Sequence, residues 1–457
     1  MRRRFHSLPH TSLVFVAIAC SNGNPPPGAG NVSSVVEWPL EVHLKAVVVS
    51  HGITYVAGQY SSPTAVELPG GLSLPPSTDS DGFVARMNGP SVAAVGLMSG
   101  TGRESVDDLA ADPIAGVIVA ATSTDSGAVK AFGQTVTGPG GKLIVAHLDP
   151  ELVPSSTSST SSSDARVSDA RVASTTAGDL IVGCTVIGGP GATSFAGIPV
   201  ASRVIVPFLR FWPEGSLRWA KALGGYDASV AIAEDGTVTV SVWTAGAIGT
   251  NDFGIVDAAK PDVPRLVIVH ADPNGATAWS QVWLSRLTNG TRGSVAASRD
   301  GTQVAVVGAV GSELATGFAN WTIGTGFVAV LDARTGVPKW YHTDPSTGYD
   351  APHFDDEDRL WSTLVVDNLA TSVWAVAVDP KRSDAALVRI SADGTRLEVL
   401  SLVYAPSVGH YTAVAVEPHK VVAVGYWYGA ADGGDGVERI GGVTTARSIS
   451  LEWRSGP

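Results

Sequence analysis

One pattern of apolar and polar positions recurs along the whole chain. A short run of β-branched and other apolar residues leads into a tight polar turn, and a second strand-like run returns from it. These turns begin at Asn88, Asp149, Trp212, Asp272, Asp332, Ala392 and Trp453. Neighbouring turns are 60 to 63 residues apart, so the register hardly drifts. A period this regular predicts one supersecondary unit, repeated seven times and stacked on copies of itself.

Each repeat predicts two antiparallel hairpins. In a clear copy, residues 266–271 lead into Asp272-Pro273-Asn274-Gly275, where Asp and Gly suit a chain reversal, and Trp279 follows in the returning strand. The second hairpin of each repeat turns at 50–52, 112–116, 175–179, 233–236, 298–301, 368–371 and 417–420. Four strands per repeat, without a helical period of comparable length, predict an all-β fold.

The two ends of the chain complete the pattern. The last repeat stops at Trp453 with no returning strand, whereas Asn31 is followed seven residues later by Trp38, the spacing that separates Trp212 from Trp219. We therefore expect residues 33–51 to finish the last blade and to begin the first. This predicts a seven-bladed β-propeller of four-stranded antiparallel blades over residues 33–457, closed by the N-terminal strand. An open stack would instead need capping repeats at both ends.

The aromatic residues divide into two groups. Trp38, Trp219, Trp279 and Trp340 recur at one phase of the repeat, which indicates packing between blades. Tyr426, Trp427 and Tyr428 are consecutive on a predicted strand, so their rings alternate between its two faces. For these three, core packing and a contact with a ligand or partner both remain open.

Two further segments are predicted from composition. The serine-rich run 155–163 is of low complexity, and we expect a disordered surface loop there. Cys184 lies in an apolar run and is expected to be a buried, inert thiol.

The N-terminus has the features of an export signal. Arg2, Arg3 and Arg4 precede the apolar run 13–19. The residues Ala17-Ile18-Ala19-Cys20 resemble the lipobox of bacterial lipoproteins, although Ala17 departs from the usual Leu or Val. An ordinary secretory signal that contains a cysteine is the alternative. The resemblance implies a signal peptide over 1–19, a membrane anchor through lipid on Cys20, and a Pro/Gly-rich tether over 20–32. It also implies a place outside the cytoplasm, at the outer membrane because Ser21 is not an acidic retention signal.

Two stretches carry a resemblance for the repeats. Residues 81–86 look like the seven-bladed propeller repeats of bacterial surface proteins and lipoproteins, and residues 331–340 resemble the repeat of quinoprotein-like propellers. The likeness covers residues 33–457 and rests on blade-building motifs. It therefore implies a fold and leaves the function open.

Composition narrows the classes of partner. The net charge is −12 and the basic residues are scattered, which argues against nucleic-acid binding. No stretch approaches the roughly eighteen apolar residues of a membrane span. The densest acidic run, 353–358, falls in a long insertion of the fifth repeat. It lacks the spacing of a calcium loop, so we expect a solvated loop.

The sequence contains none of the local motifs G-x-S-x-G, H-E-x-x-H, Walker loop or C-x-x-C. We therefore expect a monomeric binding or assembly scaffold for a protein or glycan partner, with no catalysis, cofactor or metal. The alternative is a propeller enzyme, either a quinoprotein-type dehydrogenase or a polysaccharide hydrolase or lyase. Two or more carboxylates or histidines within hydrogen-bond reach at the channel mouth would favour the enzyme.

Overall fold

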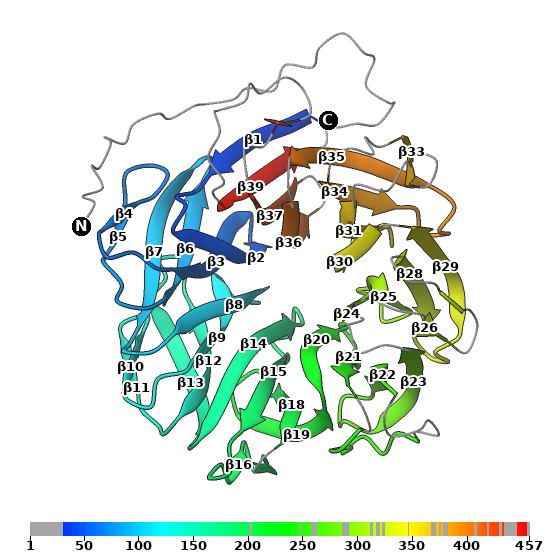
Figure 1. Ribbon diagram of the computed structural model, residues 1–457, viewed down its shortest axis with the longest axis horizontal. Coiled ribbons are helices and arrows are strands. Elements are labelled where there is room, and N and C mark those ends of the chain that lie inside the picture. The colour runs from blue at the N-terminus through cyan, green and yellow to red at the C-terminus, as the bar shows by residue number, and fades with distance from the viewer. Residues whose placement is uncertain are drawn as a thin grey trace, which may run out of the picture.

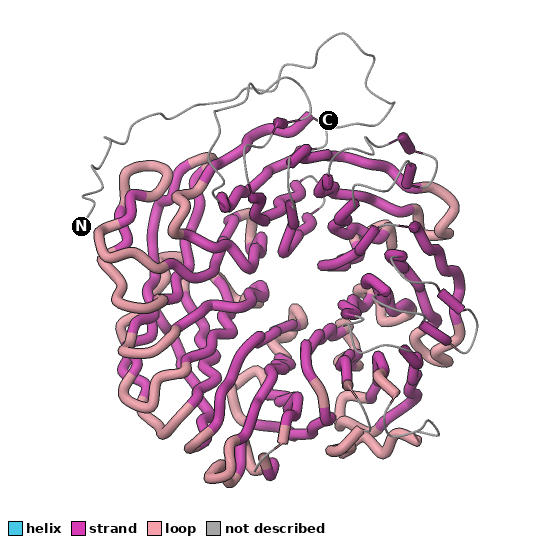
Figure 2. The backbone as a smooth tube through the Cα atoms, in the orientation of Figure 1, coloured by secondary structure: helices cyan, strands magenta, loops and turns pink. Residues whose placement is uncertain are grey.

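The fold is a ring of seven antiparallel sheets around a central axis (Figures 1 and 2). In the described part of this computed structural model, secondary structure consists of strands and turns, and no helix there could cross a bilayer. The structure describes residues 31–200, 203–245, 248–256, 263–285, 292–310, 314–316, 320–321, 325–345, 347–366, 372–373, 376–377, 383–405, 409–417, 420–428, 432–433 and 446–454.

Each blade is a four-stranded sheet whose strands follow chain order from the axis outwards, except that the first strand of the chain is the outermost strand of blade 7. Blade 1 contains β2 (Val42–Ser50), β3 (Ile53–Tyr60), β6 (Asp81–Asn88) and β7 (Ser91–Ser99). Blade 2 contains β8 (Glu104–Ala111), β9 (Val117–Ser123), β12 (Gly141–Leu148) and β13 (Pro154–Ser162). Blade 3 contains β14 (Ala165–Ser174), β15 (Leu180–Gly188), β18 (Val204–Phe211) and β19 (Leu217–Gly224).

The remaining blades follow the same order. Blade 4 contains β20 (Tyr226–Ile232), β21 (Val238–Thr244), β22 (Arg265–Ala271) and β23 (Thr277–Ser285). Blade 5 contains β24 (Arg292–Ala297), β25 (Gln303–Val310), β28 (Thr325–Asp332) and β29 (Pro338–Pro345). Blade 6 contains β30 (Thr347–Phe354), β31 (Leu360–Val366), β34 (Ser383–Ile390) and β35 (Leu397–Ala405). Blade 7 contains β36 (Gly409–Glu417), β37 (Lys420–Tyr428), β39 (Ala446–Arg454) and β1 (Asn31–Glu37).

Short strands lie in the loops between the second and third strands of six blades. They are β4 (Val66–Glu67), β5 (Ser73–Leu74), β10 (Val129–Ala131), β11 (Gln134–Val136), β16 (Ser194–Phe195), β17 (Ile198–Pro199), β26 (Leu314–Ala315), β27 (Asn320–Trp321), β32 (Ser372–Val373), β33 (Val376–Ala377) and β38 (Asp432–Gly433).

The predicted closure is confirmed. β1 is the outermost strand of blade 7 and pairs with β39, from Asn31 opposite Arg454 to Glu37 opposite Ile449. β2 then begins blade 1 at its innermost position. Strand β1 starts at Asn31, within the segment expected to be tether, because the pairing partner β39 extends to Arg454. The two chain ends are thus joined through backbone hydrogen bonds (Figure 1).

The hydrophobic core lies between neighbouring blades. One cluster joins Ala57 and Val84 of blade 1 to Val106 and Val119 of blade 2. Another joins Trp38 and the β37 residues of blade 7 to the inner strands of blade 1. Cys184, on β15, is fully buried in a third cluster, and burial raises the pKa of its thiol. Each sheet therefore buries both of its faces against adjacent sheets.

Three tryptophans link consecutive blades in one recurring contact, which we call the tryptophan link. From the outer strands of blades 3, 4 and 5, the indole N–H groups of Trp219, Trp279 and Trp340 donate to the backbone carbonyls of Pro273, Ala333 and Ala392 in the next blade's outer turn. The donor–acceptor distances are 3.1, 2.6 and 2.9 Å. Each of these contacts joins the outer strand of one blade to the outer turn of the next.

Trp38 is buried in the core between blades 7 and 1. It follows the far end of β1, is 3% exposed and lies 5.9 Å from the ring of Phe83.

A glycine in each receiving turn makes room for the linking tryptophan. Gly336 has φ +70°, and a Cβ added there would lie 2.8 Å from Trp279. Gly215 holds the same place in blade 3 with φ +85° and has open space, because the outer strand of blade 2 carries no tryptophan. Gly336→Ala is therefore expected to lower the free energy of unfolding by about 1–2 kcal/mol more than Gly215→Ala. Urea unfolding of both variants measures this, and equal losses would contradict the link.

Two predictions about segments were wrong. The serine-rich run forms β13, which pairs with β12 from Gly141 opposite Ser162 to Leu148 opposite Pro154. β13 is the outermost strand of its blade, so its backbone pairs with a neighbouring strand on one side only. Small hydroxyl side chains are therefore sufficient there. The acidic run 353–358 is not an insertion: it forms the first turn of blade 6, whereas Asn368 and Thr371 lie outside the described residues.

The acidic run was mistaken for an insertion because the first turn of blade 6 lacks the glycine found at this position in other blades. In blades 2 to 5 the first turn has a left-handed glycine, at Gly116, Gly178, Gly236 and Gly301. In blade 6 Asp358 takes that conformation, with φ +55°, so no glycine signals the turn. Aspartate is one of the few residues that tolerate this conformation.

Candidate binding site at the channel mouth

The first turns of the blades gather around one mouth of the axial channel. The innermost strands β2, β8, β14, β20, β24, β30 and β36 surround the axis, and each leads into a turn at the same end (Figure 1). Loops presented by a rigid scaffold are where binding residues concentrate.

Neighbouring first turns contact each other. His51 Nε2 of blade 1 lies 3.0 Å from the carbonyl oxygen of Asp112 in blade 2. The Thr176 hydroxyl of blade 3 donates to Glu234 Oε2 of blade 4, at 2.6 Å. The Glu234 N–H donates in turn to the carbonyl of Arg299 in blade 5, at 3.3 Å. Polar contacts thus join the first turns of blades 1 and 2 and those of blades 3, 4 and 5.

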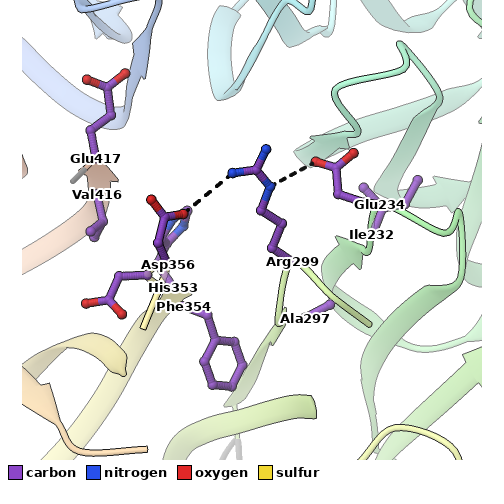
Figure 3. Close-up of a pocket in the computed structure, with 10 residues that line it drawn as sticks. Ile232, Glu234, Ala297, Arg299, His353, Phe354, Asp356, Val416 and Glu417 are labelled. Atoms are coloured by element: carbon purple, nitrogen blue, oxygen red, sulfur yellow. Dashed lines mark ion pairs between the residues drawn. The ribbon is translucent and has the colours of Figure 1, made fainter. Parts of the chain in front are cut away.

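A cavity of about 230 Å³ opens where the turns of four successive blades meet. Blade 4 supplies Ile232 and Glu234, and blade 5 supplies Ala297 and Arg299. Blade 6 supplies residues 353–356, and blade 7 supplies Val416 and Glu417. Apolar strand ends form its base, and charged turn residues form its rim (Figure 3).

Arg299 lies between two carboxylates in this cavity. Its Nε is 4.0 Å from Glu234 Oε1, and its Nη1 is 3.6 Å from Asp356 Oδ1. The Arg299 side chain is 67% exposed, so both ion pairs are weak and exchangeable. Glu417, from blade 7, also lines the cavity (Figure 3). The site therefore has two carboxylates in contact with one loosely held guanidinium, and the carboxylate of Glu417 in its lining.

Asp355 fixes the shape of the blade 6 turn. Its carboxylate accepts hydrogen bonds from the backbone N–H groups of Glu357 and Arg359, the Arg359 side chain and the indole of Trp361. Burial alone would raise the pKa of Asp355, but these donors outweigh it and the pKa is lowered. Asp355 therefore remains ionised and holds Asp356 at the cavity.

His353 adds a neutral ring to the same wall. Desolvation lowers the pKa of His353, against the opposing effects of Asp355 and Asp356. The imidazole is therefore uncharged at neutral pH and can donate or accept one hydrogen bond. Among the described residues, no group of three or more His, Cys, Asp or Glu side chains has the geometry to hold a metal ion.

A second polar region lies deeper in the channel, at the middle of the innermost strands. Six of these strands show a register shift there. Such bulges re-aim side chains, and they bring polar residues to the axis. The Asp107 carboxylate contacts Lys45 Nζ at 2.8 Å and Thr122 Oγ1 at 2.6 Å. It also accepts from the Ala170 N–H at 3.4 Å, which joins blades 1, 2 and 3.

Arg171 carries positive charge into this region. Desolvation would lower the pKa of Arg171, but Asp108, Asp350, Asp107 and Asp169 outweigh it and raise the pKa. Asp350 belongs to blade 6, so its charge acts across the channel. The axis is therefore lined by balanced charges from several blades.

The other predicted site residues are only partly placed. Tyr426, Trp427 and Tyr428 lie at the end of β37, and their side chains are outside the described residues. Cys20, with the rest of 1–30, is also outside them. The mouth cavity was missed at the sequence level because its members come from four repeats. The one signal was the acidic run, which marks one of the four turns.

Two or more carboxylates or histidines within hydrogen-bond reach at the channel mouth would favour an enzyme. In the described lining, Glu234 and Asp356 contact Arg299 and Thr176 and not each other. One carboxylate–histidine pair does occur on this face: His147 Nδ1 lies 2.8 Å from Asp112 Oδ2. It lies within blade 2, outside the cavity lining, and connects the third strand to the first turn.

Comparisons with known proteins concern the fold. No model of a known protein family matches the chain, and no curated protein sequence matches it. Among solved structures, the Dos1 propeller is similar with a TM-score of 0.45 at 8% identity, over 92% of this chain and 95% of that one. The phage phi92 endosialidase gives 0.42 at 6% identity, over 94% of this chain and 70% of that one. A Synechocystis apocarotenoid oxygenase variant gives 0.36 at 12% identity, over 78% and 70%.

The protein is a β-propeller. This conclusion rests on its own sheet topology, seven four-stranded antiparallel blades closed through β1. The similar structures include proteins named as enzymes, and they assign no activity to this propeller.

Proposed function

We propose that this propeller is a binding module that holds a cationic segment of a partner protein at the channel mouth. The observation that carries the proposal is the cavity around Arg299, to which four successive blades each contribute. A rigid ring that supplies one site from several blades is suited to recognition, because little ordering is needed on binding.

The charges at the mouth favour a basic partner. Acidic residues on the first turns outnumber basic ones: Asp112, Asp179, Glu234, Asp235, Asp300, Asp355, Asp356, Glu357, Asp358 and Glu417, against Arg299, Arg359 and Lys420. The whole chain has a net charge of −12, which attracts cationic partners over distance.

The weakness of the Arg299 ion pairs suggests how a partner would bind. An incoming arginine or lysine can compete with Arg299 for Glu234 and Asp356, since those contacts are long and exposed. Glu417 and the neutral His353 then provide further acceptors. The apolar base formed by Ile232, Ala297 and Val416 can cover the aliphatic part of the side chain.

We include in this proposal the lipid anchor on Cys20 and a location outside the cytoplasm, at the outer membrane. It is supported by the lipobox resemblance of residues 17–20 and the basic residues before the apolar run. Incorporation of labelled fatty acid into the expressed protein tests it, and lack of label would refute the anchor.

Neutralising the mouth is expected to abolish cationic binding. In Glu234→Gln/Asp356→Asn/Glu417→Gln, affinity for a fluorescent arginine-rich hexapeptide should fall at least about tenfold, because three acceptor charges are lost. Fluorescence anisotropy at low and at physiological salt measures this, and binding to the unaltered protein should weaken as salt rises.

The matched control carries three neutralised acids elsewhere, Glu41→Gln/Glu67→Gln/Glu214→Gln, all at exposed positions. It should bind like the unaltered protein. Equal binding by both triple variants, or equal binding of an uncharged hexapeptide, would contradict the proposed site. Photo-crosslinking from Ala297 in envelope membranes then identifies the natural partner.

A further inference from the structure

The face opposite the mouth cavity carries a buried acidic group between blades 1 and 2. Residues 100–103 form the loop that crosses from β7 to β8, and Glu104 is the first residue of β8. Because β8 ends at the mouth turn 112–116, Glu104 lies at the other end of the channel wall. Glu104 is 0% exposed.

One oxygen of this carboxyl has no partner. Glu104 Oε1 accepts a hydrogen bond from the Ser123 hydroxyl at 2.8 Å. Glu104 Oε2 is buried and makes no hydrogen bond. An ionised carboxylate in such a place is costly, whereas a protonated one loses little. The geometry therefore favours the neutral acid.

Its charged neighbours reinforce that preference. Asp79, Asp81 and Asp125 all disfavour ionisation of Glu104. Lys142 is fully buried, but its ammonium donates to the backbone carbonyls of Asp125 and Gly140 and not to Glu104. Tyr60 donates to Asp81 Oδ2 at 3.4 Å and is not directed at Glu104. Three acids thus disfavour charge on Glu104, whereas the one buried lysine nearby donates two hydrogen bonds to backbone carbonyls.

The crossing loop rests directly on these carboxyl groups. The Thr101 N–H and hydroxyl donate to Asp125 Oδ2, at 2.8 and 3.0 Å. A Cβ added at Gly100 would lie 2.7 Å from Asp125 Oδ2 and 2.9 Å from Glu104 Oε1. Charge that develops on Glu104 therefore acts on the contact that holds the loop.

The electrostatics agree with the geometry. Burial raises the pKa of Glu104 to about 7, helped by Asp81, Asp125 and Asp79 and opposed by the Ser123 hydrogen bond. Its ordinary value is 4.5. Burial also raises the pKa of Asp81. Because the pKa is higher when the loop is closed, the closed loop is favoured at low pH. That advantage is lost as pH rises from about 4.5 through about 7.

We propose that Glu104 makes the loop 100–103 a pH-sensitive closure: the loop is packed while Glu104 carries a proton, and it opens to water when Glu104 ionises. Opening exposes the blade 1–blade 2 boundary on the face opposite the binding cavity. The closure is independent of the cationic site, so either proposal can fail alone.

Hydrogen exchange of the unaltered protein tests the closure. After correction for the intrinsic pH dependence of amide exchange, the opening constant of residues 100–103 and 124–127 should rise at least about tenfold between pH 5 and pH 8. A flat profile in these segments would overturn the proposal.

Two variants assign the effect to Glu104. Glu104→Gln keeps the shape of the side chain and cannot ionise, so its opening constant should stay at the unaltered protein's pH 5 level throughout. Glu214→Gln, at an exposed turn, should keep the full pH dependence. If Glu104→Gln keeps the pH dependence, or if Asp81→Asn alone removes it, Glu104 is not the responsible group.

Discussion

A chain lacking residues 31–45 is expected to form an open, aggregation-prone ring. The deletion removes β1 from β39, Trp38 from the blade 7–blade 1 core, and the first part of β2. Val42 and Leu44, both 1% exposed, are lost with it. Burial of each such side chain contributes about 1.5–3 kcal/mol. The exposed edge of β39 would then be free to pair with other chains.

Thermal unfolding and sedimentation velocity measure this effect. The control is a chain that begins at Asn31, which retains β1 and should melt and sediment like the full-length protein. If the chain lacking residues 31–45 also melted like the full-length protein and stayed monomeric, closure through β1 would not stabilise the ring.

Asp107→Ala is expected to lower the free energy of unfolding by about 3–5 kcal/mol. The Asp107 carboxylate is buried and connects Lys45 of blade 1 to the backbone of Ala170 in blade 3. Removing it leaves a partly buried ammonium without its partner, and breaking a buried ion pair carries a cost of this size. Urea unfolding at pH 7 measures the loss.

A double-mutant cycle separates the ion pair from the loss of packing. Lys45→Met alone should cost less, because Ser105, Thr122 and the Ala170 N–H still satisfy Asp107. The double variant should be more stable than the sum of the single losses implies. Strict additivity would show that Lys45 and Asp107 do not interact.

Asp107 also determines whether stability rises or falls as the pH is lowered. Burial alone would raise the pKa of Asp107, but Lys45, Thr122 and Ser105 outweigh it and the pKa is lowered. A lowered pKa contributes stability above the ordinary value of 3.8, and that stability is lost as pH falls through the native value. Glu104 acts in the opposite direction near neutral pH. Stability is therefore expected to be greatest at mildly acidic pH.

Most of the fold could be predicted from the sequence because every blade is built from the same pattern of turns and apolar runs. Turn residues and apolar runs repeat at fixed spacing, so the blade number, the strand order and the closure through β1 followed from local signals. The constant phase of the tryptophans indicated packing between blades, whereas the hydrogen bonds that three of them make to the next blade were not predicted. Prediction failed where one blade used a different residue for the same geometry, as Asp358 does in place of glycine.

The sites could not be predicted in the same way. Glu234, Arg299, Asp356 and Glu417 are separated by roughly one repeat each, and only the closed ring places them around one cavity. The same is true of Lys45 and Asp107, whose contact depends on bulges that no turn residue marks. For the serine-rich segment the composition was misleading, because low complexity does not distinguish an edge strand from a loop.

The position of β1 has a consequence for how the molecule can be attached to anything. Asn31 pairs with Arg454, which in turn pairs with Lys420 beside the mouth turn of blade 7. The polypeptide therefore arrives at the circumference of the disc, level with the cavity (Figure 1). A surface that holds the residues before Asn31 would therefore hold the disc at its edge and not at the face that carries the cavity.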